Sequence, residues 1–201
     1  KERFELTVEF IPVAQGEAPA EKFLPITKLE QWGLQDDKEV FENKIGNRAV
    51  FMEGSPLAFV GGRRVYIDSS NQDTAPFYKE EELMLPIRFV SEALKGSTSW
   101  VAARNAADVS MNGITISTQA GADTVLVEDQ VKKLRVPITE RNGKLFASAR
   151  DIAEIFRKSV YFFDGIVILS HKHADYDAQT LADIKRLLGT HIEINGAPFE
   201  G

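Results

Sequence analysis

Two segments of the chain match each other without a gap, and this internal duplication constrains the fold more than any other sequence feature. Residues 83–94 (LMLPIRFVSEAL) align with residues 145–156 (LFASARDIAEIF) at a constant offset of 62 positions, and a leucine, an arginine and a glutamate are identical. Apolar residues recur at intervals of three and four, which predicts a short helix with one buried stripe in each copy. Duplication favours a structural or binding array over a single catalytic centre.

The residues around each predicted helix repeat as well. An apolar run, a glycine turn and an alternating run predict a β-hairpin at 54–67, and a second hairpin is predicted at 121–136. After the helices, residues 100–117 and 160–169 are rich in β-branched and aromatic side chains, which favours two more hairpins. We therefore predict an α+β chain with two tandem repeats, each made of a β-hairpin, a short helix and a β-hairpin, with antiparallel sheets packed on the helices.

The first copy carries a characteristic proline-arginine segment. Residues 85–94 (LPIRFVSEAL) are followed by Trp100 in a predicted strand. This combination resembles the copper amine oxidase N-terminal domain, a stalk-like repeat of secreted proteins from paenibacilli and related Gram-positive bacteria. The family signature has a Leu-Val-Pro-Leu-Arg segment, a short helix with a glutamate and a strand with a tryptophan. The resemblance covers about residues 49–170.

The second copy is less similar to that signature. It keeps Arg150 and Glu154, but Ser148 replaces the proline and Tyr161 lies near the tryptophan position. Ser148, followed three positions later by Asp151, predicts a capping box that begins the helix without the proline of the first copy. The resemblance implies a first repeat at residues 49–118 and a second at 119–170.

Family members occur mostly as appendages of cell-wall or polysaccharide-active enzymes. The resemblance therefore implies a non-catalytic accessory module of a secreted or cell-surface bacterial multidomain protein. It would act in spacing, in docking or in weak binding of extracellular polysaccharide or cell wall, with neighbouring domains as partners and no cofactor. The alternative is a fragment of a polysaccharide lyase or glycoside hydrolase whose catalytic domain lies elsewhere. Aromatic candidates for stacking on sugars are Trp32, Tyr66, Phe77, Tyr78 and Trp100.

Structural roles also account for the motif residues without a ligand. The set consists of Pro86, Arg88, Glu92, Trp100, Arg150 and Glu154. Proline suits the first turn of a helix, where its missing N–H costs nothing. Each arginine precedes a glutamate by four positions, so the two can pair on one helix face for about 0.2–0.5 kcal/mol. We expect the tryptophan to lie in the core.

One motif suggests chemistry. A His-x-His-x-Asp sequence follows the last predicted strand and contains His171, His173 and Asp175. Metallo-β-lactamase-like hydrolases present metal ligands in this way, and two histidines on alternate residues can reach one zinc ion. Here Tyr176 stands where the next histidine belongs, and the chain has only one further histidine, His191. We therefore predict no metal and no catalytic residue, with a metal-dependent hydrolase using the first two histidines as the minor alternative.

Composition limits the remaining classes. A chain of 201 residues with 43% hydrophobic residues is long enough and apolar enough to fold. The absence of cysteine excludes disulfides, zinc-thiolate sites and thiol catalysis. A net charge of −6 without a basic run disfavours nucleic acid and anionic membranes as partners, and no apolar run reaches the length of a membrane span.

The segments outside the repeats give simpler predictions. Residues 1–48 are expected to contain a strand at 4–10 and a linker, and to border a neighbouring domain. Residues 171–201 are expected to form a helix, capped by Thr180 and Asp183 and ended by Gly189, and then a short strand. Because the sequence begins with a lysine, we expect it to be a part of a longer protein.

Overall fold

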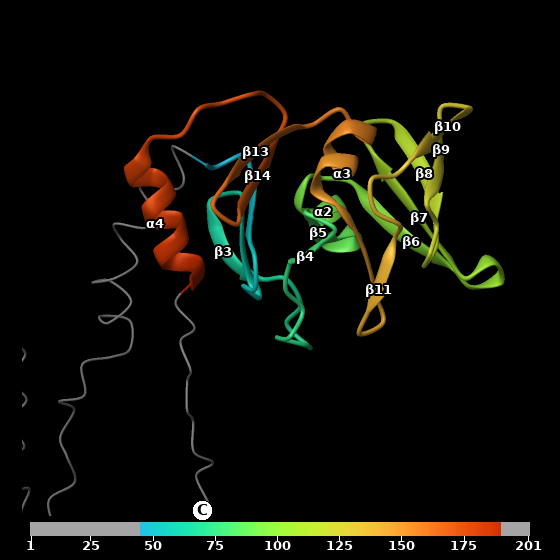
Figure 1. The fold of residues 1–201 in the computed structure, drawn as a ribbon, viewed down its shortest axis with the longest axis horizontal. Coiled ribbons are helices and arrows are strands. Elements are labelled where there is room, and N and C mark those ends of the chain that lie inside the picture. Colours follow the sequence, from blue (N-terminus) through green and yellow to red (C-terminus); the bar gives the residue numbers. More distant parts are fainter. Residues whose placement is uncertain (1–44, 190–201) are drawn as a thin grey trace, which may run out of the picture. The chain divides into compact units, whose positions relative to one another are not determined.

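The computed structural model describes residues 45–189, which all belong to the larger of two compact units, residues 38–201. The described part is an α+β fold dominated by antiparallel strands (Figure 1). The predicted strand at 4–10, the strand at 191–194, Trp32 and His191 lie outside the described residues. None of the helices within 45–189 is long and apolar enough to cross a membrane.

Four antiparallel sheets make up this fold. The five-stranded sheet has the order β13 (Ser159–Phe163), β14 (Ile166–Ser170), β1 (Ala49–Met52), β2 (Leu57–Val60) and β3 (Arg63–Tyr66). The four-stranded sheet has the order β11 (Thr139–Arg141), β12 (Lys144–Ser148), β5 (Glu82–Pro86) and β4 (Phe77–Lys79). The third sheet contains β6 (Ser97–Val101), β7 (Ala106–Met111) and β8 (Ile114–Thr118). The fourth is the hairpin of β9 (Thr124–Val127) and β10 (Gln130–Lys133).

Each of the four predicted hairpin regions contains paired antiparallel strands. The β2–β3 and β9–β10 hairpins precede the helices, and β6–β7–β8 and β13–β14 follow them. The Gly61–Gly62 turn between β2 and β3 has positive φ at both glycines, which is the conformation a tight hairpin turn requires. Local alternation and turn residues thus predicted these elements correctly.

The two matching segments fold alike. Each forms a strand followed at once by a seven-residue helix: β5 leads into α2 (Ile87–Ala93), and β12 leads into α3 (Ala149–Ile155). The two strands pair with each other in antiparallel register, with Leu85 opposite Ala147. The helices are shorter than the apolar spacing predicted, because residues 82–86 and 144–148 are strands of the four-stranded sheet.

The two helices begin differently and end alike. Pro86 is the N-cap of α2 with extended geometry, one position before the first turn where it was expected. Ser148 Oγ accepts hydrogen bonds from the N–H groups of Arg150 and Asp151, so the predicted serine cap is confirmed. At the other end, the Gly96 N–H donates to Ser91 O and the Lys158 N–H to Ala153 O, which closes both helices in the same C-terminal motif.

The main apolar core joins these layers. Helices α2 and α3 lie between the five-stranded sheet and the β6–β7–β8 sheet (Figure 1). Of the helix stripes predicted to be buried, Val90, Leu94, Ile152, Ile155 and Phe156 are at most 5% exposed, whereas Phe89, also predicted to be buried, is only half-buried against this core. A short helix is stable only through such packing, so the buried stripe explains why seven residues stay helical.

Helix α4 (Ala178–Gly189) forms a second, smaller core. Its buried stripe of Leu181, Ile184 and Leu188 packs in a cluster with Val50 and Ile168 of the five-stranded sheet. The helix was predicted, but its cap was not. Asp177 Oδ1 accepts the Thr180 N–H at 2.7 Å, so the aspartate before the helix caps it in place of the threonine.

Candidate functional site

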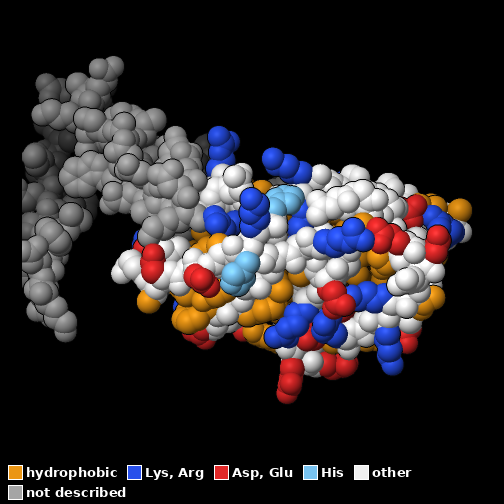
Figure 2. Space-filling model, turned by 90° about the horizontal axis from the view of Figure 1, so that it is seen from above, with side chains coloured by type: hydrophobic (Ala, Val, Ile, Leu, Met, Phe, Trp, Pro, Cys, Tyr) orange, Lys and Arg blue, Asp and Glu red, His pale blue; other side chains and the backbone are white. Residues whose placement is uncertain are grey.

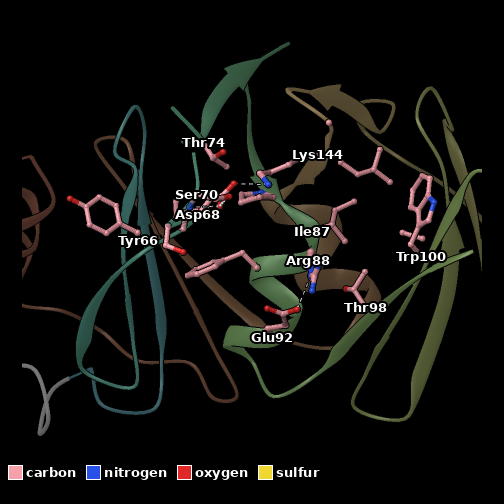
Figure 3. Close-up of a pocket in the computed structure, with 17 residues that line it drawn as sticks. Tyr66, Asp68, Ser70, Thr74, Ile87, Arg88, Glu92, Thr98, Trp100 and Lys144 are labelled. Carbon is pink, nitrogen blue, oxygen red and sulfur yellow. Dashed lines mark hydrogen bonds and ion pairs between the residues drawn. The ribbon is translucent and has the colours of Figure 1, made fainter. Parts of the chain in front are cut away.

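An open cleft of about 650 Å³ lies along helix α2 (Figure 3). We call it the α2 cleft. Its lining comes from the end of β3 and the loop after it (66–70 and 74), the start of α2 (86–89 and 92), β6 with β7 (98, 100 and 107) and the tip of the β11–β12 hairpin (143–145). Segments far apart in the sequence therefore form this cleft.

A hydrogen-bonded pair lies on the helix that runs along the cleft. Arg88 Nε donates to Glu92 Oε1 at 2.9 Å, which is the predicted pairing four positions apart. Both side chains are largely exposed, at 78% and 51%. Such a surface pair contributes at most about 1 kcal/mol to stability. Because both side chains are exposed, the guanidinium and the carboxylate are accessible to a ligand.

A more enclosed ion pair lies at one end of the cleft. Lys144 Nζ contacts Asp68 Oδ2 at 2.6 Å, and the Ser70 hydroxyl and N–H both donate to Asp68 Oδ1. Hydrogen bonds from Lys144 and Ser70 hold the pKa of Asp68 far below its usual range, although burial opposes them. Asp68 is therefore a fixed anion that orders the loop after β3.

Two aromatic side chains lie at opposite ends of the cleft (Figure 3). Trp100 on β6 is 57% exposed and Tyr66 on β3 is 43% exposed. The prediction that Trp100 lies in the core is therefore wrong, because β6 turns this side chain towards the cleft and away from the buried face. Of the other aromatic candidates, Tyr78 is 45% exposed and Phe77 is partly buried against Phe146.

The corresponding face of helix α3 carries ion pairs. Arg135 Nη1 contacts Asp151 Oδ1 at 2.6 Å, and its Nη2 contacts Glu154 Oε2 at 2.9 Å. Lys132 also pairs with Glu154. Hydrogen bonds from Lys132 and Arg135 lower the pKa of Glu154. Ionic contacts therefore occupy the α3 face, whereas the α2 face adjoins an open cleft.

The expected pair of Arg150 with Glu154 does not form. Arg150 Nη1 instead donates to Glu82 Oε1 at 2.8 Å, and its guanidinium lies 4.4 Å from the centre of the Phe162 ring. Glu82 also accepts the Ser148 hydroxyl at 2.6 Å. The antiparallel pairing of β5 with β12 places Glu82 within reach, and spacing along one helix cannot show such a partner.

The His-x-His-x-Asp motif does not gather into a metal centre. His173 and Asp175 lie 3.5 Å apart and are both highly exposed. His171 Nδ1 lies 3.0 Å from Lys158 Nζ, and the charge of Lys158 lowers the pKa of His171. No group of three or more histidine, cysteine or acidic side chains within 45–189 is arranged to hold a metal ion. A cation beside His171 opposes a metal dication there, so these residues do not fit a copper or zinc site.

Comparison with known families now identifies the class of domain. The family model of the copper amine oxidase N-terminal domain matches residues 60–165, more than half of the chain. This chain belongs to that family, as the proline-arginine segment predicted. No curated protein matches the chain. The copper in the family name has no set of ligands among the described residues.

Sequence reasoning missed two important groups of this fold. Asp68 and Lys144 are 76 positions apart, and only the folded chain brings them together. Lys158 is buried, at 8% exposed, and composition does not show which lysine is buried. The Asp-Ser-Ser sequence at 68–70 was a usable signal, since an aspartate followed by serines favours a local turn.

Proposed function

We propose that this domain is a non-catalytic accessory module of a secreted bacterial multidomain protein and that it docks on extracellular polysaccharide through the α2 cleft. The observation that carries the proposal is the α2 cleft itself, with an exposed tryptophan at one end and hydrogen-bonding groups along its length. Concave sites with an aromatic surface and a few placed polar groups are typical binding sites for small molecules and sugars.

The side chains of the cleft suit a neutral or weakly charged sugar chain. The Trp100 indole offers a flat apolar surface for the C–H face of a sugar ring, and large aromatic rings bring much contact area at low cost in conformational entropy. Arg88, Glu92 and Thr98 offer donors and acceptors for hydroxyl groups. Because the cleft is open, we expect weak binding that needs several contacts along a polymer.

Tryptophan fluorescence provides a direct test. The chain has two tryptophans, so a Trp32→Phe background leaves Trp100 as the only indole reporter. Titration with a panel of soluble polysaccharides should change this emission for at least one polymer. In the wild-type chain, Trp100→Ala should weaken binding of the same polymer in affinity electrophoresis by about tenfold, the effect of a lost contact of about 1.4 kcal/mol.

Tyr78→Ala is the matched control, because Tyr78 is a similarly exposed aromatic residue that does not line the α2 cleft. Its binding should equal that of the wild type. Equal losses in both variants would point to nonspecific adsorption. Retention of full affinity by Trp100→Ala would refute docking at the α2 cleft.

We also infer that the fold is a duplication in which the five-stranded sheet takes strands from both copies. Equal spacings support this: 62 positions separate β4 from β11, β5 from β12, α2 from α3 and β6 from β13, and 67 separate β2 from β9 and β3 from β10. Leu85 faces Ala147, its own counterpart 62 positions later. A two-fold axis through this pair would relate the copies, and superposition of 77–101 on 139–163 in an experimental structure tests it.

The proposal also states that the protein is secreted and that a catalytic domain lies elsewhere in the same polypeptide. The absence of cysteine is compatible with either the cytoplasm or a Gram-positive exterior, so the secreted location rests on the family resemblance. Fractionation of the source bacterium with an antibody to this domain should find it in the medium or on the cell surface. Detection in the cytoplasm alone would contradict the assignment.

A further inference from the structure

A second cleft, of about 680 Å³, opens at the C-terminal end of helix α2, and we propose that it binds a phosphate group. We call it the lysine cleft. Its walls are the turn before β1 (46–48), the β2–β3 turn (60–61), the end of α2 (92–95) and the end of β14 (170–172). This proposal does not depend on sugar docking at the α2 cleft, although Glu92 lines both clefts.

The first observation is a buried ammonium group behind the lysine cleft. Lys158 is only 8% exposed. Its Nζ lies 3.0 Å from Asn112 Oδ1 and 3.0 Å from His171 Nδ1, and it pairs with no carboxylate among residues 45–189. Burial lowers the pKa of Lys158. A buried charge without a counter-ion is costly in free energy. The positive charge of Lys158 would therefore favour the binding of an anion nearby.

His171 connects this ammonium group to the cleft. The Lys158 Nζ lies 3.0 Å from Nδ1 and 3.5 Å from Nε2, and an ammonium group can only donate, so the neutral imidazole accepts through one nitrogen and keeps an N–H donor on the other. His171 lines the cleft. The nearby charges of Lys158 and Lys95 lower its pKa, which agrees with a positive field at this place. A phosphate oxygen at the histidine would therefore meet a donor supported by a cation.

Two further lysines line the same cleft. Lys95 follows α2 and Lys172 follows β14, and neither forms an ion pair with a residue in the described part of the chain. The position 62 residues after Lys95 is Arg157, which contacts Glu128 at 2.7 Å. Glu92 is the acidic residue of the lining, and Arg88 already neutralises it at 2.9 Å. The lining of this cleft therefore carries excess positive charge.

The surface view shows basic and acidic side chains together on one face of the molecule (Figure 2). Histidine side chains lie beside several lysine and arginine side chains on the face drawn in Figure 2. Lysine ammonium groups bind phosphate as point charges, and the planar fork of arginine binds carboxylate and phosphate alike. Arg48, the one arginine in the lining, is stacked on the Tyr176 ring at 5.5 Å. The site therefore suits phosphate, either free or carried by a polymer.

Titration of the full chain with inorganic phosphate, followed by NMR of the histidine rings, tests the proposal. The ring signals of His171 should shift with saturation, whereas those of the exposed His173 should stay in place. His171→Gln assigns the signals. Sodium polyphosphate is a second probe: tighter binding per phosphate than with the free ion would identify a polymer as the preferred source, and equal binding would identify the free ion.

Charge variants make the test specific. Lys172→Gln and Lys95→Gln, at solvent-accessible positions, should each weaken phosphate binding by about tenfold, the effect of one lost charge-assisted hydrogen bond. Lys158→Met should abolish the shift of His171 if the variant keeps the wild-type circular dichroism spectrum. The control is Lys133→Gln, an exposed lysine on β10 that does not line the cleft, and its affinity should equal that of the wild type.

Three results would overturn the assignment. One is an equal shift of His171 and His173 with phosphate, which would mean a general salt effect. Another is unchanged affinity in both exposed variants. The third is binding of acetate or oligogalacturonate as tightly as phosphate, which would show that the cleft does not select phosphate chemistry.

Discussion

Phe156 is the side chain whose loss should most clearly expose how the repeat helices are stabilised. It is 2% exposed and belongs to the main core with Ile152 and Ile155, directly after helix α3. Transfer of a phenylalanine side chain out of water contributes about 1.5–3 kcal/mol. Truncation also leaves a cavity, at about 24 cal/mol per Å³, so Phe156→Ala should cost about 3–5 kcal/mol in total.

Urea denaturation of the full chain measures this cost. The midpoint should fall while the slope of the unfolding free energy against urea stays unchanged, because the variant alters stability without altering the surface exposed on unfolding. A loss of about 3–5 kcal/mol is a large share of the ~5–15 kcal/mol typical of a folded domain. The fall in the midpoint should therefore be easily measured.

Two controls separate packing from other effects of the same substitution. Phe156→Leu should lose much less, because it refills most of the volume. Arg157→Ala, at the next position, removes an exposed pair with Glu128 and should change stability by less than about 1 kcal/mol. If the unfolding free energy of Phe156→Ala lies within 1 kcal/mol of the wild-type value, core packing does not hold the short helix. If that stable variant also loses polymer binding, the helix is a ligand surface.

Other parts of the fold give further predictions. Arg135→Ala leaves the buried Asp151 carboxylate without its guanidinium, and urea denaturation should show a loss of about 1–3 kcal/mol, less than for a fully buried pair because Arg135 is 41% exposed. The pKa of Asp68 is lowered in the folded chain, so its contribution to stability is complete above the unfolded value of about 3.9 and is lost as the pH falls below it. Asp68→Asn should therefore flatten the fall in thermal stability below pH 4, and an unchanged acid profile would contradict the role of Lys144. Elemental analysis of the purified chain should find no stoichiometric copper or zinc, and a tightly held metal lost in His171→Ala would reverse our interpretation of the histidine motif.

Local patterns in the sequence predicted the elements of this fold well. The hairpins and helices follow from alternation, turn residues and spacings of three and four, all of which act over a few neighbouring residues. Burial of Val90 and Ile152 follows from the same spacing. Family membership was also visible, because residues 85–94 and Trp100 hold a local signature.

Partners that meet across the fold could not be predicted in this way. β1 pairs with β14, and Arg150 pairs with Glu82, which lies 68 positions earlier in the chain. Both pairings follow from the order of the strands in the sheets, which local spacing does not encode. Trp100 illustrates a second limit. Its strand has mostly exposed or half-buried residues without clean alternation, so its face could not be assigned from the sequence.

The proposed duplication gives two equivalent helices whose outer faces differ. On the α3 face, Arg135 joins Asp151 and Glu154 across the surface of the helix. On the α2 face, the position that corresponds to Asp151 is Phe89, an apolar residue that stacks edge-on against Phe51 and packs on the core. Aromatic packing against the core therefore helps to hold α2, whereas ion pairs on the outer surface help to hold α3. Since α2 does not need a bridge across its outer face, Arg88 and Glu92 stay accessible beside Trp100.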